Sequence, residues 1–386
     1  MNGNDRHAVA AGTLFDGYRL HHDCAVVIEG PRVLAIVPTH EMPATTPVCA
    51  LPEGAWLAPG FIDTQVNGGG DVLFNDQPTP DGIARIVAAH RRFGTTALLP
   101  TLISDTPAKM RAALEAVRRA AVAEPSVIGI HLEGPFLSPD RPGVHDPAML
   151  RVPDQRDAEV LTARRAGVVL ATLAPERAPA GFIAQLVDAG VRVALGHSMA
   201  TYAQTKAALA EGLSGFTHLF NAMRPLDSRE PGPIAAALET PGAWFGMIVD
   251  GHHVAPPMLR LALRGVAHPI LVSDAMPPVG GSRSSFILNG ERISVNNGRC
   301  ARADGTLAGA ALGMATAVRN CVELLGVPLT QALRFASAEP ASFLGLAATL
   351  GRIAPGYRAD LVAFDPVDIK IHQTWVAGRA TLDVGQ

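Results

Sequence analysis

The chain has 386 residues, 48% of them hydrophobic and 17% charged, a composition typical of a globular protein with a substantial core. Its 32 Lys and Arg residues nearly balance its 35 Asp and Glu residues, so the net charge of −3 favours neither a nucleic-acid nor a membrane partner. The four cysteines form no CxxC or zinc-finger spacing, no signal pattern opens the chain, and no apolar run reaches the ~18 residues of a membrane span. These features predict a cytoplasmic protein with reduced thiols.

Short apolar runs broken by Gly and Pro mark both ends of the chain. They lie between about residues 8 and 56 and return in RADLVAFDP and IHQTWVAG near the C-terminus. Because the two ends share this pattern and flank a different middle, we expect them to pair. The sequence predicts one small β-sandwich domain from residues 1–56 and 348–386.

The middle of the chain, residues 57–347, alternates apolar runs with helix-like stretches such as 106–123 and 179–190. The candidate strands are LAPGFID, TTALLPTLI, VIGIHLEG, VVLATLAP, VRVALGHS, GFTHLFN, WFGMIVDG and HPILVSDA. Eight β/α units over this length predict a (β/α)8 TIM-type barrel. The Asn289-Gly290 dipeptide between alternating apolar residues predicts a β-hairpin inserted near 284–302.

Polar side chains follow several of the predicted strands, and in a TIM-type barrel these strand ends meet at the catalytic face. They are Gln65, Glu133, His197, His218, the DGHH segment with Asp250 and His253, and Asp274. A lone His or Asp at such a place is usually a hydrogen-bonded structural residue or a helix cap. One Glu, two His and one Asp at equivalent positions are harder to explain in that way. One carboxylate and two imidazoles suit zinc, with iron(II) as the alternative, and Asp274 could act as a base beside them.

The stretch APGFIDTQVNGGG carries Gln65 and Asn67 where a barrel hydrolase often has His-x-His. Amides bind divalent metals poorly, and Asn67 also fits a plain polar turn before the glycines. The three lysines, Lys109, Lys206 and Lys370, all lie away from the strand ends, so no carboxylated lysine can bridge two ions. The sequence therefore predicts one divalent ion per subunit, with Gln65 contacting it through water.

Several motifs together resemble the amidohydrolase superfamily, and within it the N-acetylglucosamine-6-phosphate deacetylases. They are PGFIDTQVNGGG, HLEGPFLSPDRPGVH, TLAPE, GHS, THLFNAM, REPG, DGHH, LVSDA and DGTLAG, and they follow the family's order over about residues 58–310. The resemblance implies hydrolysis of the acetamide of N-acetylglucosamine 6-phosphate. The ion would be held by Glu133, His197 and His218. Asp274 would be the general base and then the acid, and His145 would contact the sugar or the acetyl carbonyl and help to polarise it.

The resemblance also implies a set of substrate contacts. They are Val144, His145, Asn221, Ala222, Arg229, Asp250, His253, Leu307, Ala308 and Gly309. Arg229 would reach the phosphate from the neighbouring subunit of a homodimer, although beside Glu230 it could equally form a surface ion pair. The register favours His253 over His252 as the phosphate ligand.

Two other functions are compatible with the sequence. One is a different amidohydrolase, of the dihydroorotase or amino-acid deacetylase kind, acting on phosphate-free substrates. The other is a barrel that binds sugar phosphates without catalysis, which the presence of Glu133, His197, His218 and Asp274 disfavours.

Overall fold

The computed structural model describes residues 6–163 and 166–381. Two compact units make up the chain. One comprises Met1–Asp63, His90–Ala97 and Met314–Gln386, and the other comprises Thr64–Ala89 and Leu98–Gly313. The predicted domain bounds, 1–56 with 348–386 and 57–347, remain a prediction. No helix in the described ranges is both long and apolar enough to cross a membrane.

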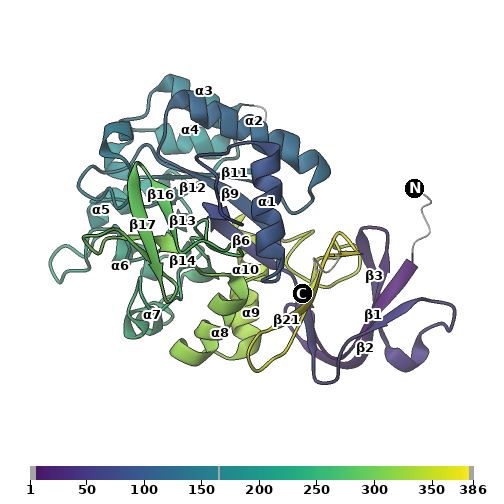
Figure 1. Ribbon diagram of the computed structural model, residues 1–386. Helices are drawn as coiled ribbons and strands as arrows, with labels where there is room; N and C mark the ends of the chain where they lie inside the picture. Colours follow the sequence, from purple (N-terminus) through teal and green to yellow (C-terminus); the bar gives the residue numbers. More distant parts are fainter. Residues whose placement is uncertain (1–5, 164–165, 382–386) are drawn as a thin grey trace. The chain divides into compact units, whose positions relative to one another are not determined.

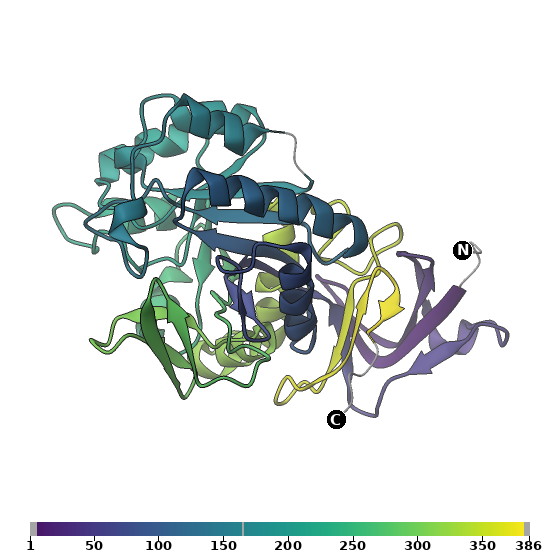
Figure 2. The same cartoon turned by 45° about the horizontal axis from the view of Figure 1, so that its top comes forward.

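The first unit contains a small sheet to which both ends of the chain contribute, with the strand order β22-β21-β20-β5-β1-β2-β3 and β4 beside β1. Figure 2 shows its N-terminal strands in purple and its C-terminal strands in yellow. Its strands are β1 (Arg6–Phe15), β2 (Leu20–Glu29), β3 (Arg32–Pro38), β4 (Val48–Ala50), β5 (Trp56–Pro59), β20 (Leu361–Phe364), β21 (Ile371–Val376) and β22 (Arg379–Ala380). Antiparallel pairing of β5 with β20 joins the two ends.

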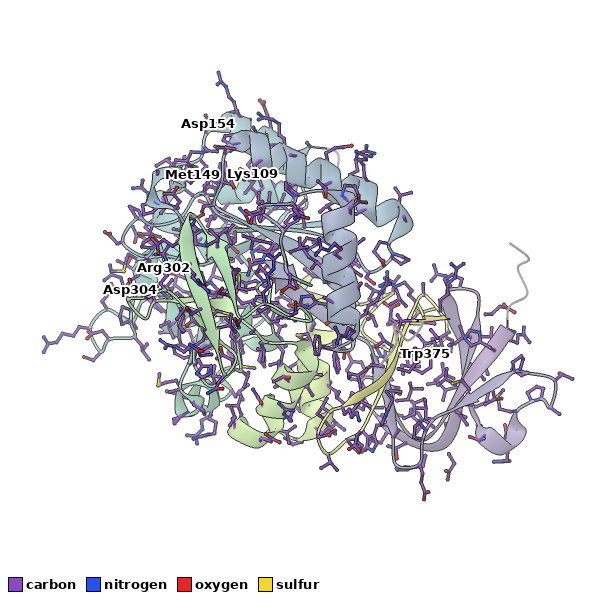
Figure 3. The ribbon with its side chains drawn as sticks, viewed as in Figure 1. Lys109, Met149, Asp154, Arg302, Asp304 and Trp375 are labelled. Carbon is purple, nitrogen blue, oxygen red and sulfur yellow. The ribbon has the colours of Figure 1, made fainter. Side chains whose placement is uncertain are left out.

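Apolar residues at alternate positions of these strands form the core of the small sheet. Leu14, Ile28, Leu361 and Trp375 all lie in one buried cluster, and Trp375 is labelled in Figure 3. The same unit contains the helices α8 (Met314–Leu325), α9 (Leu329–Phe335) and α10 (Ala338–Phe343), and the short 3-10 helix η1 (Thr39–Glu41).

The second sheet is the predicted TIM-type barrel, with the order β15-β14-β13-β12-β11-β10-β9-β6. Its strands are β6 (Phe61–Val66), β9 (Thr95–Ile103), β10 (Gly129–Glu133), β11 (Val168–Leu173), β12 (Arg192–Leu195), β13 (Gly215–Phe216), β14 (Trp244–Met247) and β15 (His268–Leu271). The pairs from β9 to β15 are parallel. A parallel bridge between Val66 and Ala275 links the first strand to the segment after the last, which closes the barrel. The predicted fold class is confirmed.

The predicted run LAPGFID is divided between the two sheets, because β5 ends at Pro59 and β6 begins at Phe61. Gly60 lies at the junction, and a Cβ atom there would lie 2.2 Å from Thr96 Cγ2. Only glycine therefore fits where the chain passes from the small sheet to the barrel strand.

Helices follow the barrel strands in the order seen in Figure 1. They are α1 (Pro80–Arg91), α2 (Pro107–Ala123), α3 (Gln155–Thr162), α4 (Phe182–Asp188), α5 (Tyr202–Ala210), α6 (Gly232–Glu239) and α7 (Pro256–Ala262), with the 3-10 helices η2 (Pro147–Met149) and η3 (Pro175–Arg177). In α2, the Thr106 side chain accepts a hydrogen bond from Lys109 N, and Pro107 occupies the first turn. Its buried face carries Met110, Ala113 and Val117 at helical spacing.

After the last barrel strand the chain forms an inserted sheet of four antiparallel strands, drawn in green in Figure 1. They are β16 (Ser285–Leu288), β17 (Glu291–Asn296), β18 (Arg299–Ala301) and β19 (Leu307–Ala310), and a two-stranded ribbon, β7 (Gly68–Gly69) with β8 (Val72–Leu73), lies in the same unit. The predicted hairpin is β16–β17. Asn289 and Gly290 both have positive φ at its turn, as a two-residue hairpin loop requires.

Candidate active site

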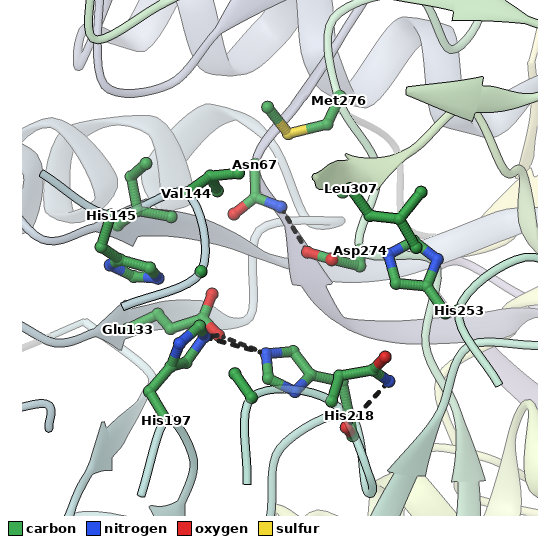
Figure 4. Close-up of a pocket in the computed structure, with 15 residues that line it drawn as sticks. Asn67, Glu133, Val144, His145, His197, His218, His253, Asp274, Met276 and Leu307 are labelled. Atoms are coloured by element: carbon green, nitrogen blue, oxygen red, sulfur yellow. Dashed lines mark hydrogen bonds and ion pairs between the residues drawn. The ribbon is translucent and has the colours of Figure 1, made fainter. Parts of the chain in front are cut away.

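A cavity of about 150 Å³ lies at the C-terminal ends of the barrel strands. Figure 4 shows its polar groups converging from strands far apart in the sequence. They include Asn67, Glu133, His145, His197, His218 and Asp274.

Three of the predicted residues bring their ligand atoms together. Glu133 ends β10, and His197 and His218 follow β12 and β13. His218 Nε2 lies 2.9 Å from Glu133 Oε1 and 3.2 Å from His197 Nε2, and His197 Nε2 lies 3.3 Å from Glu133 Oε1. All three side chains are buried. Ligands placed tetrahedrally at roughly 2.0–2.2 Å from a zinc ion stand about 3.3 Å apart, so these spacings fit one divalent ion.

The surrounding hydrogen bonds orient two of these ligands. His197 Nδ1 lies 2.9 Å from the carbonyl oxygen of Arg141, so Nδ1 carries the proton and the lone pair of Nε2 faces Glu133. Gln65 Nε2 donates to Glu133 Oε2 at 3.1 Å, which leaves Oε1 for the ion. Gln65 thus contacts the carboxylate directly and lies behind it, outside the cavity lining.

The charges of this group depend on one another. Burial alone would raise the pKa of Glu133, but the close contacts with His197 and His218 hold it well below its usual value. Burial would likewise lower the pKa of His218, and its contact with Glu133 raises it instead. An ionised carboxylate among imidazoles is the donor set that a borderline divalent ion prefers.

Asp274 faces the same space from the segment after β15, and it is 8% exposed. Burial and the negative charge of Glu133 raise its pKa from 3.8 to about 6. Asn67 Nδ2 donates to its Oδ1 at 2.7 Å, so its second oxygen is left for another partner. A carboxylate with a pKa this close to neutrality suits a general base that must later act as an acid.

His145 lies on the side of the cavity away from Asp274 and His253 (Figure 4). The centroid of its ring is 4.4 Å from that of the His197 ring. The backbone N–H of Ser104 donates to His145 Nδ1 at 3.2 Å, and Ser104 Oγ lies 2.7 Å from the same nitrogen. An N–H can only donate, so Nδ1 is the acceptor and the proton lies on Nε2. Burial and the nearby His197 lower the pKa of His145 to about 3, so the ring is a neutral donor.

The opposite part of the lining contains Asn221, Ala222 and His253. His253 Nδ1 lies 2.7 Å from Asp250 Oδ2, and both side chains are nearly buried. Burial raises the pKa of Asp250, and the hydrogen bond from His253 outweighs this and lowers it. An ionised Asp250 holds the His253 ring at the cavity lining, where an imidazole N–H can donate to an anion. Asp250 lies behind His253 and outside the lining, as does the exposed His252.

Arg229 is exposed and does not line the cavity of its own chain, and its described hydrogen bond runs from its backbone N–H to Asp227. Leu307 and Gly309 of β19 do line it, whereas Ala308 is buried in the core cluster beneath. A Cβ atom on Gly309 would lie 2.5 Å from Met276 Cγ, so this part of the wall has room for a glycine alone.

Sequence reasoning did not identify three further groups of the site. Ile103 and Met276 add apolar surface, and Ser104 holds His145. Ser104 is a polar residue directly after a predicted strand, so its position at a strand end could have identified it as a site residue. The two apolar residues look like ordinary core residues in the sequence.

The chain is similar to known proteins over nearly its whole length. Residues 56–381 match the model of the amidohydrolase family. The chain belongs to the amidohydrolase family. It is 40% identical to the N-acetylgalactosamine-6-phosphate deacetylase of a Shewanella species, over 96% of this chain and 95% of the relative. The predicted resemblance to this family is confirmed, and so is the prediction that the chain is a hydrolase.

Two solved structures superpose over 97% of the chain and 99% of their own. One is the N-acetylglucosamine-6-phosphate deacetylase of Pasteurella multocida, with a TM-score of 0.94 and 32% identity. The other is a mutant of the Mycobacterium smegmatis enzyme in complex with N-acetyl-D-glucosamine-6-phosphate, with a TM-score of 0.86 and 36% identity.

Proposed function

We propose that the chain hydrolyses the acetamide of N-acetyl-D-glucosamine 6-phosphate, which yields acetate and D-glucosamine 6-phosphate. The observation that carries this proposal is the convergence of Glu133, His197 and His218 on one point, with Asp274 and His145 facing it from two sides. The names of the similar proteins supply the substrate class. Zinc is the proposed ion, with iron(II) as the alternative.

A divalent ion held by Glu133, His197 and His218 would supply a Lewis acid that acidifies water and polarises a carbonyl. The free oxygen of Asp274 would take a proton from the attacking water as the tetrahedral carbon forms. His145 Nε2–H would donate to the acyl oxygen as negative charge develops on it. Asp274 would then pass the proton to the nitrogen, the C–N bond would break, and acetate and the free amine would leave.

Phosphate binding would hold the acetamide in place over these groups. His253, oriented by Asp250, would contact the phosphate together with Asn221 and the backbone at Ala222. Arg229 of a second subunit would add positive charge, which makes a homodimer part of the proposal. Such positioning can lower the barrier by up to ~7–11 kcal/mol. A phosphorylated sugar does not cross membranes unaided, which supports a cytoplasmic location.

A second candidate substrate is N-acetyl-D-galactosamine 6-phosphate. The Shewanella relative that bears this activity in its name shares 40% of its residues with the chain, more than the 32% and 36% of the two solved structures. The two sugars differ only in the orientation of one ring hydroxyl. The same ion site and the same base therefore serve both.

Acetate release from both sugar phosphates, measured side by side, tests the proposal. We expect turnover of at least one of them, its loss on adding a chelator, and its return with zinc or iron(II). The ratio of kcat/KM for the two epimers decides between the candidates. If free N-acetylglucosamine or N-acetylated amino acids are turned over equally well, the proposed phosphate recognition is wrong.

A further inference from the structure

The carbonyl oxygen of Val144 links the inserted sheet to the wall of the cavity. Asn289 Nδ2, at the β16–β17 turn, donates to this oxygen at 2.9 Å. Arg302 Nη2, just after β18, approaches the same oxygen at 3.5 Å. Val144 itself lines the cavity and directly precedes His145.

The two donors are fixed within the inserted sheet. Asn289 has a φ of +51° beside Gly290 at +80°, so the tight turn presents its side chain at one place. Arg302 Nε lies 3.0 Å from Glu291 Oε2. Figure 3 shows Arg302 beside the two green strands of the insert.

Apolar packing supports the same link. The Val144 side chain packs on a buried cluster that includes Phe286, Leu288 and Ile293 of the insert. The insert also supplies Leu307 to the cavity lining. The inserted sheet therefore forms part of the wall and contacts the segment on which His145 lies.

We propose that Asn289 and Arg302 are positioning residues, which act through the Val144 carbonyl to hold His145 Nε2 toward the acyl oxygen. This inference rests on the proposed function. The donors contact no reacting atom, so their loss should lower kcat through His145 and leave phosphate binding intact.

The variant Asn289→Gly separates this role from a purely structural one. Glycine adopts positive φ more readily than asparagine, so the turn is kept and only the amide donor is lost. Asn297→Gly is a matched control at the next turn, where Asn297 has a φ of +49° before Gly298. The contact described for Asn297, from His252 Nε2 to its carbonyl oxygen, uses the main chain and survives the change.

We expect Asn289→Gly to lower kcat about threefold to tenfold, as befits one hydrogen bond, with KM for the sugar phosphate nearly unchanged. Asn289→Asp should lower it further, because a carboxylate repels the Val144 carbonyl. In a His145→Ala background Asn289→Gly should have no further effect. Equal kcat for Asn289→Gly and Asn297→Gly, or an undiminished effect in the His145→Ala background, would overturn the proposal.

Amide hydrogen exchange provides a readout that does not depend on turnover. The His145 N–H is bonded to the Pro142 carbonyl at 3.0 Å, so its exchange rate reports on this loop. We expect faster exchange there in Asn289→Gly but not in Asn297→Gly, and unchanged exchange in both would also overturn the proposal. If the wild type releases no acetate from any sugar phosphate, the proposed function fails, whereas the exchange result still decides whether Asn289 holds the loop.

Discussion

Asn67 donates a hydrogen bond from Nδ2 to Oδ1 of Asp274 at 2.7 Å, and both side chains are buried in the barrel mouth. This bond leaves the second oxygen of Asp274 free to exchange a proton. Asn67 Oδ1 is also buried and has no partner within the described chain. Asn67 therefore belongs to the proposed catalytic machinery, and its place after the first strand is not just a polar turn.

The bond from Asn67 helps to keep Asp274 ionised, since it lowers the pKa that burial and Glu133 raise. In Asn67→Ala the pKa of Asp274 should therefore rise, and the acidic limb of the kcat/KM profile should move up by about one pH unit. A pH profile of acetate release checks this. An acidic limb that stays in place would show that Asp274 is not the group that titrates.

Asp274→Asn should lose nearly all turnover and keep the ion. The amide still offers Oδ1 to Asn67, but it cannot take a proton from water. We expect kcat to fall by about 10²–10⁴, the usual worth of a general base, with bound metal per subunit unchanged. Elemental analysis of the purified variant, with its kinetics, measures both. A variant with wild-type kcat would exclude Asp274 as the base.

The same substitution should stabilise the protein when no metal is bound. Because the pKa of Asp274 rises from 3.8 to about 6 on folding, the folded state binds a proton between these values that the unfolded chain has lost. The contribution of this group to stability therefore falls as the pH rises through that window, by on the order of 3 kcal/mol.

In chelator, Asp274→Asn should thus unfold at higher urea concentration than the wild type at about pH 7.5 and at a similar concentration near pH 4. Urea titrations at the two pH values measure the difference. If the variant and the wild type differ in stability by the same amount at both pH values, the raised pKa of Asp274 is wrong.

Glu176 supports the loop that carries His197. Its two oxygens accept hydrogen bonds from Met199 N at 2.6 Å and Ser198 Oγ at 2.7 Å, and His197 has a φ of +50°. Glu176→Gln replaces one acceptor with a donor, so the loop should loosen and the affinity for zinc should fall about tenfold. Competition with a zinc chelator gives the affinity.

Glu211→Gln is the matched control, because Glu211 likewise accepts a hydrogen bond on each carboxylate oxygen, here from the backbone N–H groups of Gly181 and Ala184, away from the cavity. It should leave zinc affinity unchanged. Equal losses in the two variants would mean that Glu176 acts only through general stability.

Much of the site could be predicted from the sequence because its signals are local. Glu133 ends an apolar strand, and His197, His218 and Asp274 each follow one. Parallel strands of a closed barrel bring such ends together. The hairpin at Asn289-Gly290 could also be predicted from the sequence, since two residues define the turn.

The features of the fold and the site that the sequence did not predict depend on contacts between distant parts of the chain. The bond from Asn67 to Asp274 spans 207 residues and exists because the Val66–Ala275 bridge closes the barrel. The strands β18 and β19 are short, so periodicity could not reveal that the hairpin is half of a four-stranded sheet. The division of LAPGFID at Gly60 required knowledge of Thr96, which lies far along the chain.

Anomalous scattering from a crystal grown with zinc, recorded at the zinc edge, tests the one-ion site most directly. We expect one peak per subunit, within about 2.0–2.2 Å of Glu133 Oε1, His197 Nε2 and His218 Nε2. A second peak of equal strength beside Gln65 and Asn67, or a zinc ion bound away from these three atoms, would contradict a single ion held by this triad.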